Sequence, residues 1–321
     1  MKRRSCLPLF FAFAILVYTT SCQHATPLPT ATLTPVPTSA VAPTPTPTLV
    51  PTSTAIPKLE AGNYKRDMVV DNLYRYYIIH IPPSLDNLKP VPVVFVFHEW
   101  QEQPTDIQTA SGFDGLADKN GFLVVYPWGT SFSWNAGGCC GFAVEKNRDE
   151  IAFIGQILSD LTTITNPDPK RIYATGFSNG AMLAYRLACE MSATFAAIAP
   201  VGGVLFYSPC QPQQPVSVMH IHGQLWDKVI PYTGGQGTGL MEGLIFPPVE
   251  EGIATWVKEN GCTGSPQEEK QESLTHTVYA YCQAGSAVEI YLINNMRHAW
   301  PRPFIFQTSK IWDFFVAHPK P

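Results

Sequence analysis

The sequence has few charged residues and no excess of positive charge. Only 14% of its 321 residues are charged, and 21 lysines and arginines stand against 25 aspartates and glutamates. Binding to phosphate backbones or anionic lipids requires a cationic surface. We therefore expect no nucleic-acid partner.

Long hydrophobic runs and repeats are also lacking. The apolar run over residues 7–18 is shorter than the roughly 20 residues with which a helix spans a bilayer. The sequence contains no internal repeat and no heptad pattern. These absences argue against a permanent transmembrane anchor, a repeat array and a coiled coil.

The beginning of the chain has the order of an export signal. Lys2, Arg3 and Arg4 precede the apolar run, and a stretch of small and polar residues over 19–22 follows it. This order predicts a signal peptide over residues 1–22. Cys22 resembles the acylated cysteine of bacterial lipoproteins, although Thr19 stands where those proteins usually have leucine. Two outcomes remain open: a lipid anchor on Cys22 as the only membrane attachment, or cleavage and release.

Residues 23–57 contain no charged residue and nine prolines among threonine, alanine and serine. This composition predicts a linker, either a semi-rigid stalk or featureless disorder. Three basic and no acidic residues lie in the first 57, so residues 58–321 keep 18 basic against 25 acidic residues, a net charge of −7. Their length suits one domain.

Six cysteines lie in this predicted domain, and export would let disulfides persist there. Cys189 with Cys210 and Cys262 with Cys282 would each close a loop of about 20 residues, for which a disulfide contributes roughly 3 kcal/mol. Cys139 and Cys140 then remain, either as a vicinal disulfide or as buried thiols.

Apolar segments alternate with helical patterns along the domain. Strands are predicted over residues 74–81, 91–97, 122–126, 171–175, 196–201, 216–221 and 288–293, and helices over 107–119, 150–164, 179–190, 250–259 and 309–317. Nearly continuous apolar strands are typical of a sheet covered on both faces. The alternation predicts an α/β fold with a mostly parallel central sheet flanked by helices.

The strongest chemical signal is Gly176-Phe177-Ser178-Asn179-Gly180, between a predicted strand and a predicted helix. A tight turn there presents the Ser178 hydroxyl above the sheet and directs the helix amino terminus at developing negative charge. Ser178 is therefore a candidate nucleophile. The alternative is a serine that only caps the helix.

A serine nucleophile needs a base and an acid that orients the base, and in this fold they follow the serine as acid and then histidine. Asp227 follows the strand over 216–221 and His298 follows the strand over 288–293. They are the candidate acid and base. Asp227 as a plain turn residue remains the alternative.

Two further sets of residues could take part in the chemistry. The backbone NH groups of Asn179 and of Glu99 or Trp100 are predicted to form an oxyanion hole. His220 and His222 share one strand, but the sequence offers no third ligand at a convincing spacing for a metal. We expect no metal and no cofactor, and we interpret His222 as a packing residue that supports the Asp227 loop.

Taken together, these segments resemble the secreted α/β-hydrolases of the polyhydroxybutyrate-depolymerase-like and feruloyl-esterase-like family. The resemblance begins near Gly62 and is carried by residues 112–127, 133–141, 171–188, 222–232, 260–262, 298–301 and 311–319. It implies an α/β-hydrolase fold, hydrolysis of carboxylic esters of hydroxycinnamoyl groups on plant polysaccharide or of short hydroxyalkanoate chains, and Ser178, Asp227 and His298 as the triad.

The resemblance also places the 134–141 segment at the site. Trp134 and Trp300 are candidate substrate contacts, with plain packing as the alternative. Two departures stand out: Glu99 replaces the family's glycine after His98, and one extra residue separates His222 from Asp227. We expect a monomeric, exported serine esterase. A peptidase of the same fold and a tethered, non-catalytic binding protein are the alternatives.

Overall fold

The computed structural model describes residues 59–86, 89–302 and 306–321. The predicted signal peptide, Cys22 and the predicted linker lie outside the described residues. None of the helices within these ranges is long and apolar enough to cross a membrane.

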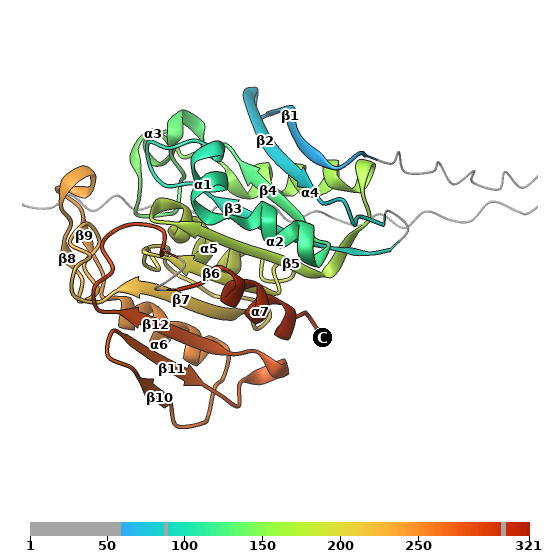
Figure 1. The fold of residues 1–321 in the computed structure, drawn as a ribbon. Coiled ribbons are helices and arrows are strands. Elements are labelled where there is room, and N and C mark those ends of the chain that lie inside the picture. Colours follow the sequence, from blue (N-terminus) through green and yellow to red (C-terminus); the bar gives the residue numbers. More distant parts are fainter. Residues whose placement is uncertain (1–58, 87–88, 303–305) are drawn as a thin grey trace, which may run out of the picture. The chain divides into compact units, whose positions relative to one another are not determined.

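One ten-stranded sheet organises the described residues (Figure 1). From one edge to the other its strands are β1 (Gly62–Val70), β2 (Leu73–Ile81), β4 (Leu123–Pro127), β3 (Val91–Phe97), β5 (Pro167–Phe177), β6 (Ala197–Val201), β7 (Ser217–Gly223), β12 (Val288–Ile293), β11 (Leu274–Tyr279) and β10 (Gln267–Lys270). The six strands from β4 to β12 are parallel, and antiparallel strands flank them at both edges.

Helices cover both faces of the sheet. Alternate side chains of β3 enter two separate cores, Val93, Phe95 and Phe97 on one face and Val94 and Val96 on the other. The first core is completed by α4 (Glu150–Ile164), α5 (Asn179–Glu190) and α6 (Val249–Glu259), and the second by α1 (Pro104–Ser111), α2 (Phe113–Asn120) and α7 (Ser309–Ala317). This arrangement explains why the central strands are apolar without alternation.

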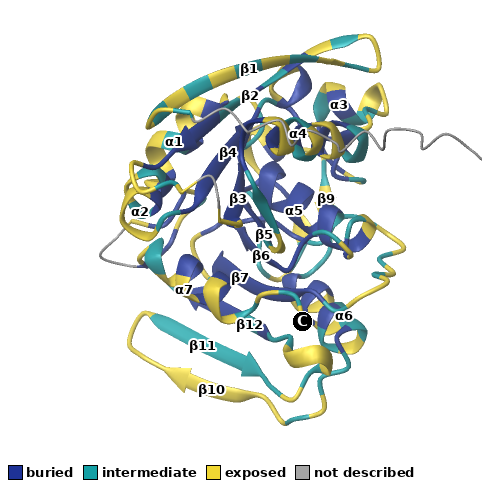
Figure 2. Ribbon diagram, turned by 90° about the vertical axis from the view of Figure 1, so that its right-hand side faces the viewer, coloured by how far each residue is buried: buried dark blue, intermediate teal, exposed yellow. Residues whose placement is uncertain are grey.

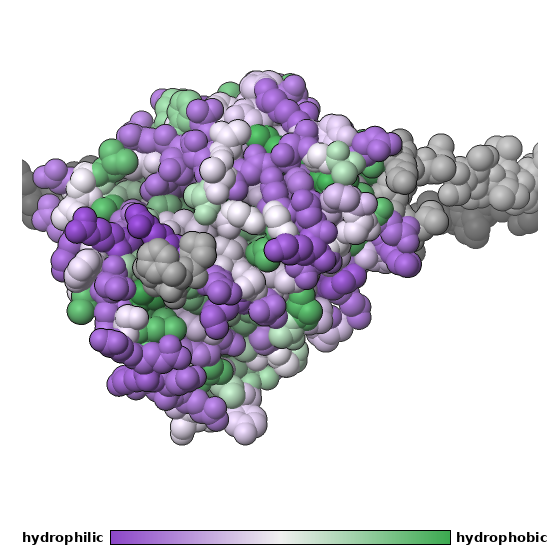
Figure 3. Space-filling model, in the orientation of Figure 1, coloured by the Kyte–Doolittle hydropathy of each residue, from purple (hydrophilic) through white to green (hydrophobic). Residues whose placement is uncertain are grey.

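Smaller elements lie in the connections. They are α3 (Gly141–Glu145), the two-stranded β8 (Gly235–Gln236) and β9 (Ile245–Phe246), and short 3₁₀ turns at Thr130–Phe132, Gly239–Met241 and Gln283–Gly285. The face drawn in Figure 3 is largely hydrophilic, with hydrophobic side chains scattered over it.

The predicted α/β architecture is confirmed, with one wrong helix. Residues 107–119 form two helices, because Gly112 adopts a left-handed conformation with φ 68° that ends α1 and begins α2. Glycine takes this conformation without steric cost. The sequence pattern also missed the edge strands β1, β10 and β11, which are exposed or half-buried (Figure 2).

The parallel strands bring four chain segments to one edge of the sheet. Glu99 follows β3, Ser178 follows β5, Asp227 follows β7 and His298 follows β12. Because these strands are parallel, their carboxyl ends meet at the same edge, where open α/β sheets form their sites.

Candidate active site

Ser178 occupies the turn between β5 and α5. Its backbone has φ 54° and ψ −116°, outside the conformations that residues other than glycine favour, and its side chain is buried. The Ser178 NH donates to the Val201 carbonyl at 2.9 Å, which fixes the turn to the neighbouring strand β6. This strained turn presents the hydroxyl at the amino terminus of α5.

His298 joins Ser178 to Asp227. Its Nε2 lies 2.9 Å from Ser178 Oγ, and its Nδ1 lies 2.8 Å from Asp227 Oδ2. The imidazole is 9% exposed and the Asp227 carboxylate is fully buried. An acid that holds Nδ1–H leaves Nε2 free to accept the serine proton. The structure thus brings together the three side chains that the sequence predicts as a triad.

The other oxygen of Asp227 holds the loop that carries it. Asp227 Oδ1 accepts hydrogen bonds from the Val229 NH at 3.1 Å and the Ile230 NH at 3.0 Å. The extra residue between His222 and Asp227 therefore does not displace the carboxylate from His298.

A buried chain of hydrogen bonds supports this loop from below. The Tyr185 hydroxyl lies 2.8 Å from His220 Nδ1, His220 Nε2 lies 3.2 Å from His222 Nδ1, and His222 Nε2 lies 2.9 Å from the Ile230 carbonyl. Burial lowers the pKa of both histidines, so both are neutral. The only consistent direction is donation from Tyr185 through both histidines to Ile230. The sequence does not reveal the roles of Tyr185 and His220, because its only signal for this chain is the pair of histidines on one strand.

The predicted oxyanion hole involves the backbone NH groups of Asn179 and of Glu99 or Trp100. Within the described residues the NH groups of Trp100 and Asn179 donate to no backbone acceptor, whereas a backbone hydrogen bond from Glu99 lowers the pKa of the Glu102 carboxyl group. Asn179 begins α5, so its NH has no partner within the helix. Glu99 does not adopt a positive φ; the left-handed residue of this loop is Gln101, with φ 68°. The replacement of glycine by Glu99 therefore introduces no backbone strain at that position.

Trp134 lies beneath this loop. Its indole is fully buried, packs against the His98 ring at 4.9 Å between centroids and donates from Nε1 to the His98 carbonyl at 2.9 Å. Its backbone NH and carbonyl bind the Asn179 side chain. The predicted substrate contact of Trp134 disagrees with this burial, because a fully buried ring has no face left for a ligand. Trp134 instead positions the two segments that carry the free NH groups.

His98 fixes the same loop from its other side. His98 Nδ1 donates to the Glu99 carbonyl at 2.7 Å, and His98 Nε2 accepts from the Gly129 NH at 2.9 Å. Burial lowers the pKa of His98 to about 4, so this ring is neutral and supplies one donor and one acceptor. Its role is structural.

A buried ion pair anchors the segment that contains Trp134. Arg75 Nη2 lies 2.8 Å from Glu150 Oε2, and both side chains are almost completely buried. Glu150 Oε1 accepts from the Asn135 NH, and Arg75 donates to the Trp128 carbonyl. A buried ion pair is stable only when the other donors and acceptors of its two side chains also have hydrogen-bond partners. The two backbone contacts supply such partners.

The Glu99 side chain enters the site itself. Its Oε2 lies 3.8 Å from His298 Nε2, and the side chain is 23% exposed. Burial is the main cause that raises the pKa of Glu99 to about 8, and the neighbouring Glu102 and Asp227 add to it. At neutral pH this carboxyl group is therefore mostly protonated.

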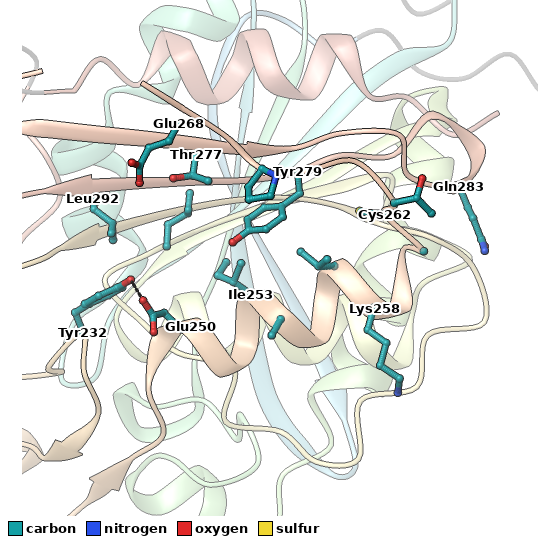
Figure 4. A pocket seen from close by; sticks show the side chains of 16 residues that line it. Tyr232, Glu250, Ile253, Lys258, Cys262, Glu268, Thr277, Tyr279, Gln283 and Leu292 are labelled. Atoms are coloured by element: carbon teal, nitrogen blue, oxygen red, sulfur yellow. Dashed lines mark hydrogen bonds between the residues drawn. The ribbon is translucent and has the colours of Figure 1, made fainter. Parts of the chain in front are cut away.

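Two cavities bear on where ligands could bind. A cavity of about 360 Å³ is lined by residues 295–302, including His298 and Trp300. Trp300 is 8% exposed and donates from Nε1 to Thr308 Oγ1 at 3.2 Å, so little of its side chain is open to a ligand. A larger cavity of about 940 Å³ lies between α6 and strands β11 and β12, with Ile253, Tyr279 and the Tyr232–Glu250 hydrogen bond in its lining (Figure 4). No member of the Ser178, Asp227 and His298 set lines it.

The six cysteines form three pairs. Cys189 binds Cys210 and Cys262 binds Cys282, as predicted, and Cys139 pairs with Cys140. Disulfides persist in oxidising compartments, which supports export of the protein. Among the described residues no group of three or more histidine, cysteine or acidic side chains is arranged to hold a metal.

The fold and the three aligned side chains define the class: an α/β-hydrolase fold with a serine, histidine and aspartate site. A family model described as esterase PHB depolymerase matches residues 75–229, which include Ser178 and Asp227. This match and the similarity to a feruloyl esterase support the resemblance to polyhydroxybutyrate-depolymerase-like and feruloyl-esterase-like proteins.

Several known proteins are similar to the chain. Feruloyl esterase B of Piromyces equi is 27% identical over 236 residues, covering 70% of this chain and 42% of that protein. A bifunctional acetylxylan esterase/xylanase of Neocallimastix patriciarum is 31% identical over 238 residues, covering 74% of this chain and 32% of that protein. The chain thus spans less than half the length of either relative. The structure of an acetyl xylan esterase from Aspergillus awamori matches with a TM-score of 0.58 and 16% identity, over 79% of this chain and 99% of that one, which supports the fold.

Proposed function

We propose that the protein is a serine esterase that hydrolyses carboxylic esters through an acyl-enzyme. One observation carries this proposal: His298 lies within hydrogen-bond distance of both Ser178 Oγ and Asp227 Oδ2. The matching family model and the names of the similar proteins support the same reaction.

The reaction follows from the geometry of the site. His298 Nε2 takes the proton from Ser178 Oγ as Oγ bonds to the ester carbonyl carbon, and the NH groups of Asn179 and of Glu99 or Trp100 stabilise the oxyanion. Collapse of this intermediate breaks the bond to the alcohol, which takes the proton from Nε2. Water then attacks the acyl-enzyme, giving its proton to His298, and Ser178 is restored with release of the acid.

We further propose the substrate class and the setting of the enzyme. The acyl group is a hydroxycinnamoyl group on plant polysaccharide or a short hydroxyalkanoate chain, with Trp300 as a contact. No cofactor, metal or nucleic acid takes part, and the enzyme is a monomer. The exported protein is either anchored through a lipid on Cys22 or released. Mass spectrometry of the mature amino terminus distinguishes these two forms.

The proposal is tested by hydrolysis of a small panel of esters. The purified protein is assayed on p-nitrophenyl acetate and butyrate, methyl ferulate and a 3-hydroxybutyrate oligomer, beside Ser178→Ala. We expect turnover of at least one ester and a loss of about 10⁴-fold or more in the variant. A wild-type protein that hydrolyses none of these esters would favour the non-catalytic binding protein instead. Hydrolysis of a peptide substrate but of no ester would favour the peptidase.

A further inference from the structure

Glu99 stands beside the nitrogen of His298 that handles protons. Its Oε2 is 3.8 Å from Nε2, too far for a hydrogen bond, while Ser178 Oγ is 2.9 Å from the same nitrogen. In ester hydrolysis the leaving alcohol oxygen must lie about 3 Å from Nε2 to receive its proton. The Glu99 carboxyl group therefore borders the position of the leaving oxygen.

The groups that face Glu99 are mainly acidic. Glu102 lies on the same loop, Asp227 follows β7, and Asp106 on α1 faces Glu102. Within the described residues no lysine or arginine forms an ion pair with Glu99 or Glu102. Among the described residues, His298 lies within 4 Å of the Glu99 carboxyl group, and the neutral ring of His98 precedes Glu99 in the chain.

This acidic surrounding keeps a proton on Glu99. Burial, the charge of Glu102 and the hydrogen bond between the two carboxyl groups all raise the pKa of Glu99, and the pKa of Glu102 is raised as well. Two adjacent carboxyl groups that share one proton behave in this way. A protonated carboxyl group is a hydrogen-bond donor and places no negative charge beside the oxyanion.

We propose that Glu99 is a further catalytic residue: when an ester binds, the single proton that Glu99 shares with Glu102 turns to the alcohol oxygen of the ester as a hydrogen bond, and the role is lost when Glu99 ionises. The inference rests on the proposed esterase function and extends it. Glu99 transfers no proton: the leaving oxygen still receives its proton from His298 Nε2. Ionised Glu99 opposes the reaction because it places a negative charge next to the oxyanion hole and offers no donor.

The sign of the pH effect follows directly. Glu99 is protonated below its pKa of about 8. We therefore expect kcat/KM to have its highest value near neutral pH and to fall as the pH rises through about 8. Glu99→Gln keeps a neutral donor at every pH and therefore removes this alkaline decline. Glu99→Ala removes the decline as well, but lowers kcat/KM at neutral pH by about three- to tenfold, the effect of one hydrogen bond.

Glu102→Gln provides the second variant. Because the charge of Glu102 raises the pKa of Glu99, neutralising Glu102 shifts the alkaline decline to lower pH without removing it. A purely structural role for Glu99 gives no reason for these opposite effects of two neighbouring substitutions. Glu272→Gln, an exposed glutamate on the β10–β11 turn, is the control and leaves the profile unchanged.

The experiment measures kcat/KM on ethyl butyrate, whose alkoxide leaving group needs a hydrogen-bond donor and a proton, from about pH 5 to about pH 10 for the wild type and these four variants, with spontaneous hydrolysis subtracted. The expected result is a decline near pH 8 in the wild type, absent in Glu99→Gln and shifted to lower pH in Glu102→Gln. An identical decline in the wild type and Glu99→Gln, or an unchanged kcat/KM in Glu99→Ala, overturns the role of Glu99 while the esterase function stands. A wild type without activity overturns both.

Discussion

Asp227 acts through both of its carboxylate oxygens. Oδ2 orients His298, and Oδ1 accepts the NH groups of Val229 and Ile230. An asparagine can keep the second set of contacts through its amide oxygen. Its NH₂ group, however, would face His298 Nδ1 and favour the tautomer in which Nε2 carries the proton.

We therefore expect Asp227→Asn to fold normally and to lose activity. The expected decrease in kcat is about 10⁴-fold, because Nε2 can no longer accept the Ser178 proton. Steady-state kinetics with p-nitrophenyl butyrate measures this decrease, and a thermal unfolding curve matching that of the wild type shows that the loop is intact. A decrease of less than about tenfold would argue that Asp227 is only a turn residue.

Single residues differed in how far the sequence could predict them. Ser178, Asp227 and His298 could be placed because each follows a strongly apolar strand and because their chain order fits the fold. Trp134 could not be placed, since an indole buried beneath a loop and an indole that contacts a ligand look identical in sequence. The proximity of Glu99 to His298 depends on how the loops after β3 and β12 meet, which no local pattern encodes.

At the scale of elements, the site depends on how closely α5 approaches the end of β3. A Cβ atom on Gly180 would lie 2.6 Å from the His98 carbonyl oxygen and closer still to the Phe97 carbonyl. The glycine thus permits contact between the helix and the loop that carries Glu99 and Trp100. Gly176, the other glycine of the motif, is required for a similar steric reason, because a Cβ on Gly176 would lie 2.7 Å from the Gly180 carbonyl.

Gly180→Ala is accordingly expected to push α5 away from this loop. We expect a loss of about 1–3 kcal/mol in the free energy of unfolding, as for overpacking in a core, and a lower kcat/KM. Urea unfolding measures the first quantity. The control is Gly155→Ala on α4, where a Cβ meets no atom within 4 Å. That variant should be neutral or more stable by up to about 1 kcal/mol. Equal stability of both variants would contradict the close approach.

Central and edge elements were not equally predictable. The buried strands β3, β4 and β6 have continuous apolar sequences, so the pattern identified them almost to their ends. β1 and β10 pair by backbone hydrogen bonds at the sheet edges and expose many polar side chains, so their sequences resemble loops. The prediction of a single helix over 107–119 was wrong at Gly112, because a periodic pattern does not reveal the left-handed conformation of this residue.

At the scale of the whole molecule, two disulfides connect different elements of the fold. The Cys189–Cys210 bond joins the last turn of α5 to the segment after β6. Cys262–Cys282 joins the end of α6 to the connection between β11 and β12. The pairing could be predicted from loop size, whereas the choice between a bond and free thiols at Cys139 and Cys140 could not.

Replacing Cys189 and Cys210 together by serine should lower the free energy of unfolding by about 3 kcal/mol, because a closed loop of about 20 residues regains its freedom in the unfolded chain. Denaturant unfolding with the other cysteines oxidised measures this change. In the converse control, a reducing agent should destabilise the wild type more than the double variant. Equal stabilities under oxidising conditions would show that the bond contributes nothing.

The central claim is that Ser178 is a nucleophile activated by His298. Its most direct test is covalent labelling by a fluorophosphonate, which reacts with activated serines, followed by peptide mass spectrometry. The predicted result is one labelled residue, Ser178, with ester hydrolysis falling in proportion to the fraction of protein labelled. In His298→Ala, labelling is expected to be much slower. No label on Ser178 in a folded, ester-hydrolysing protein would contradict the claim.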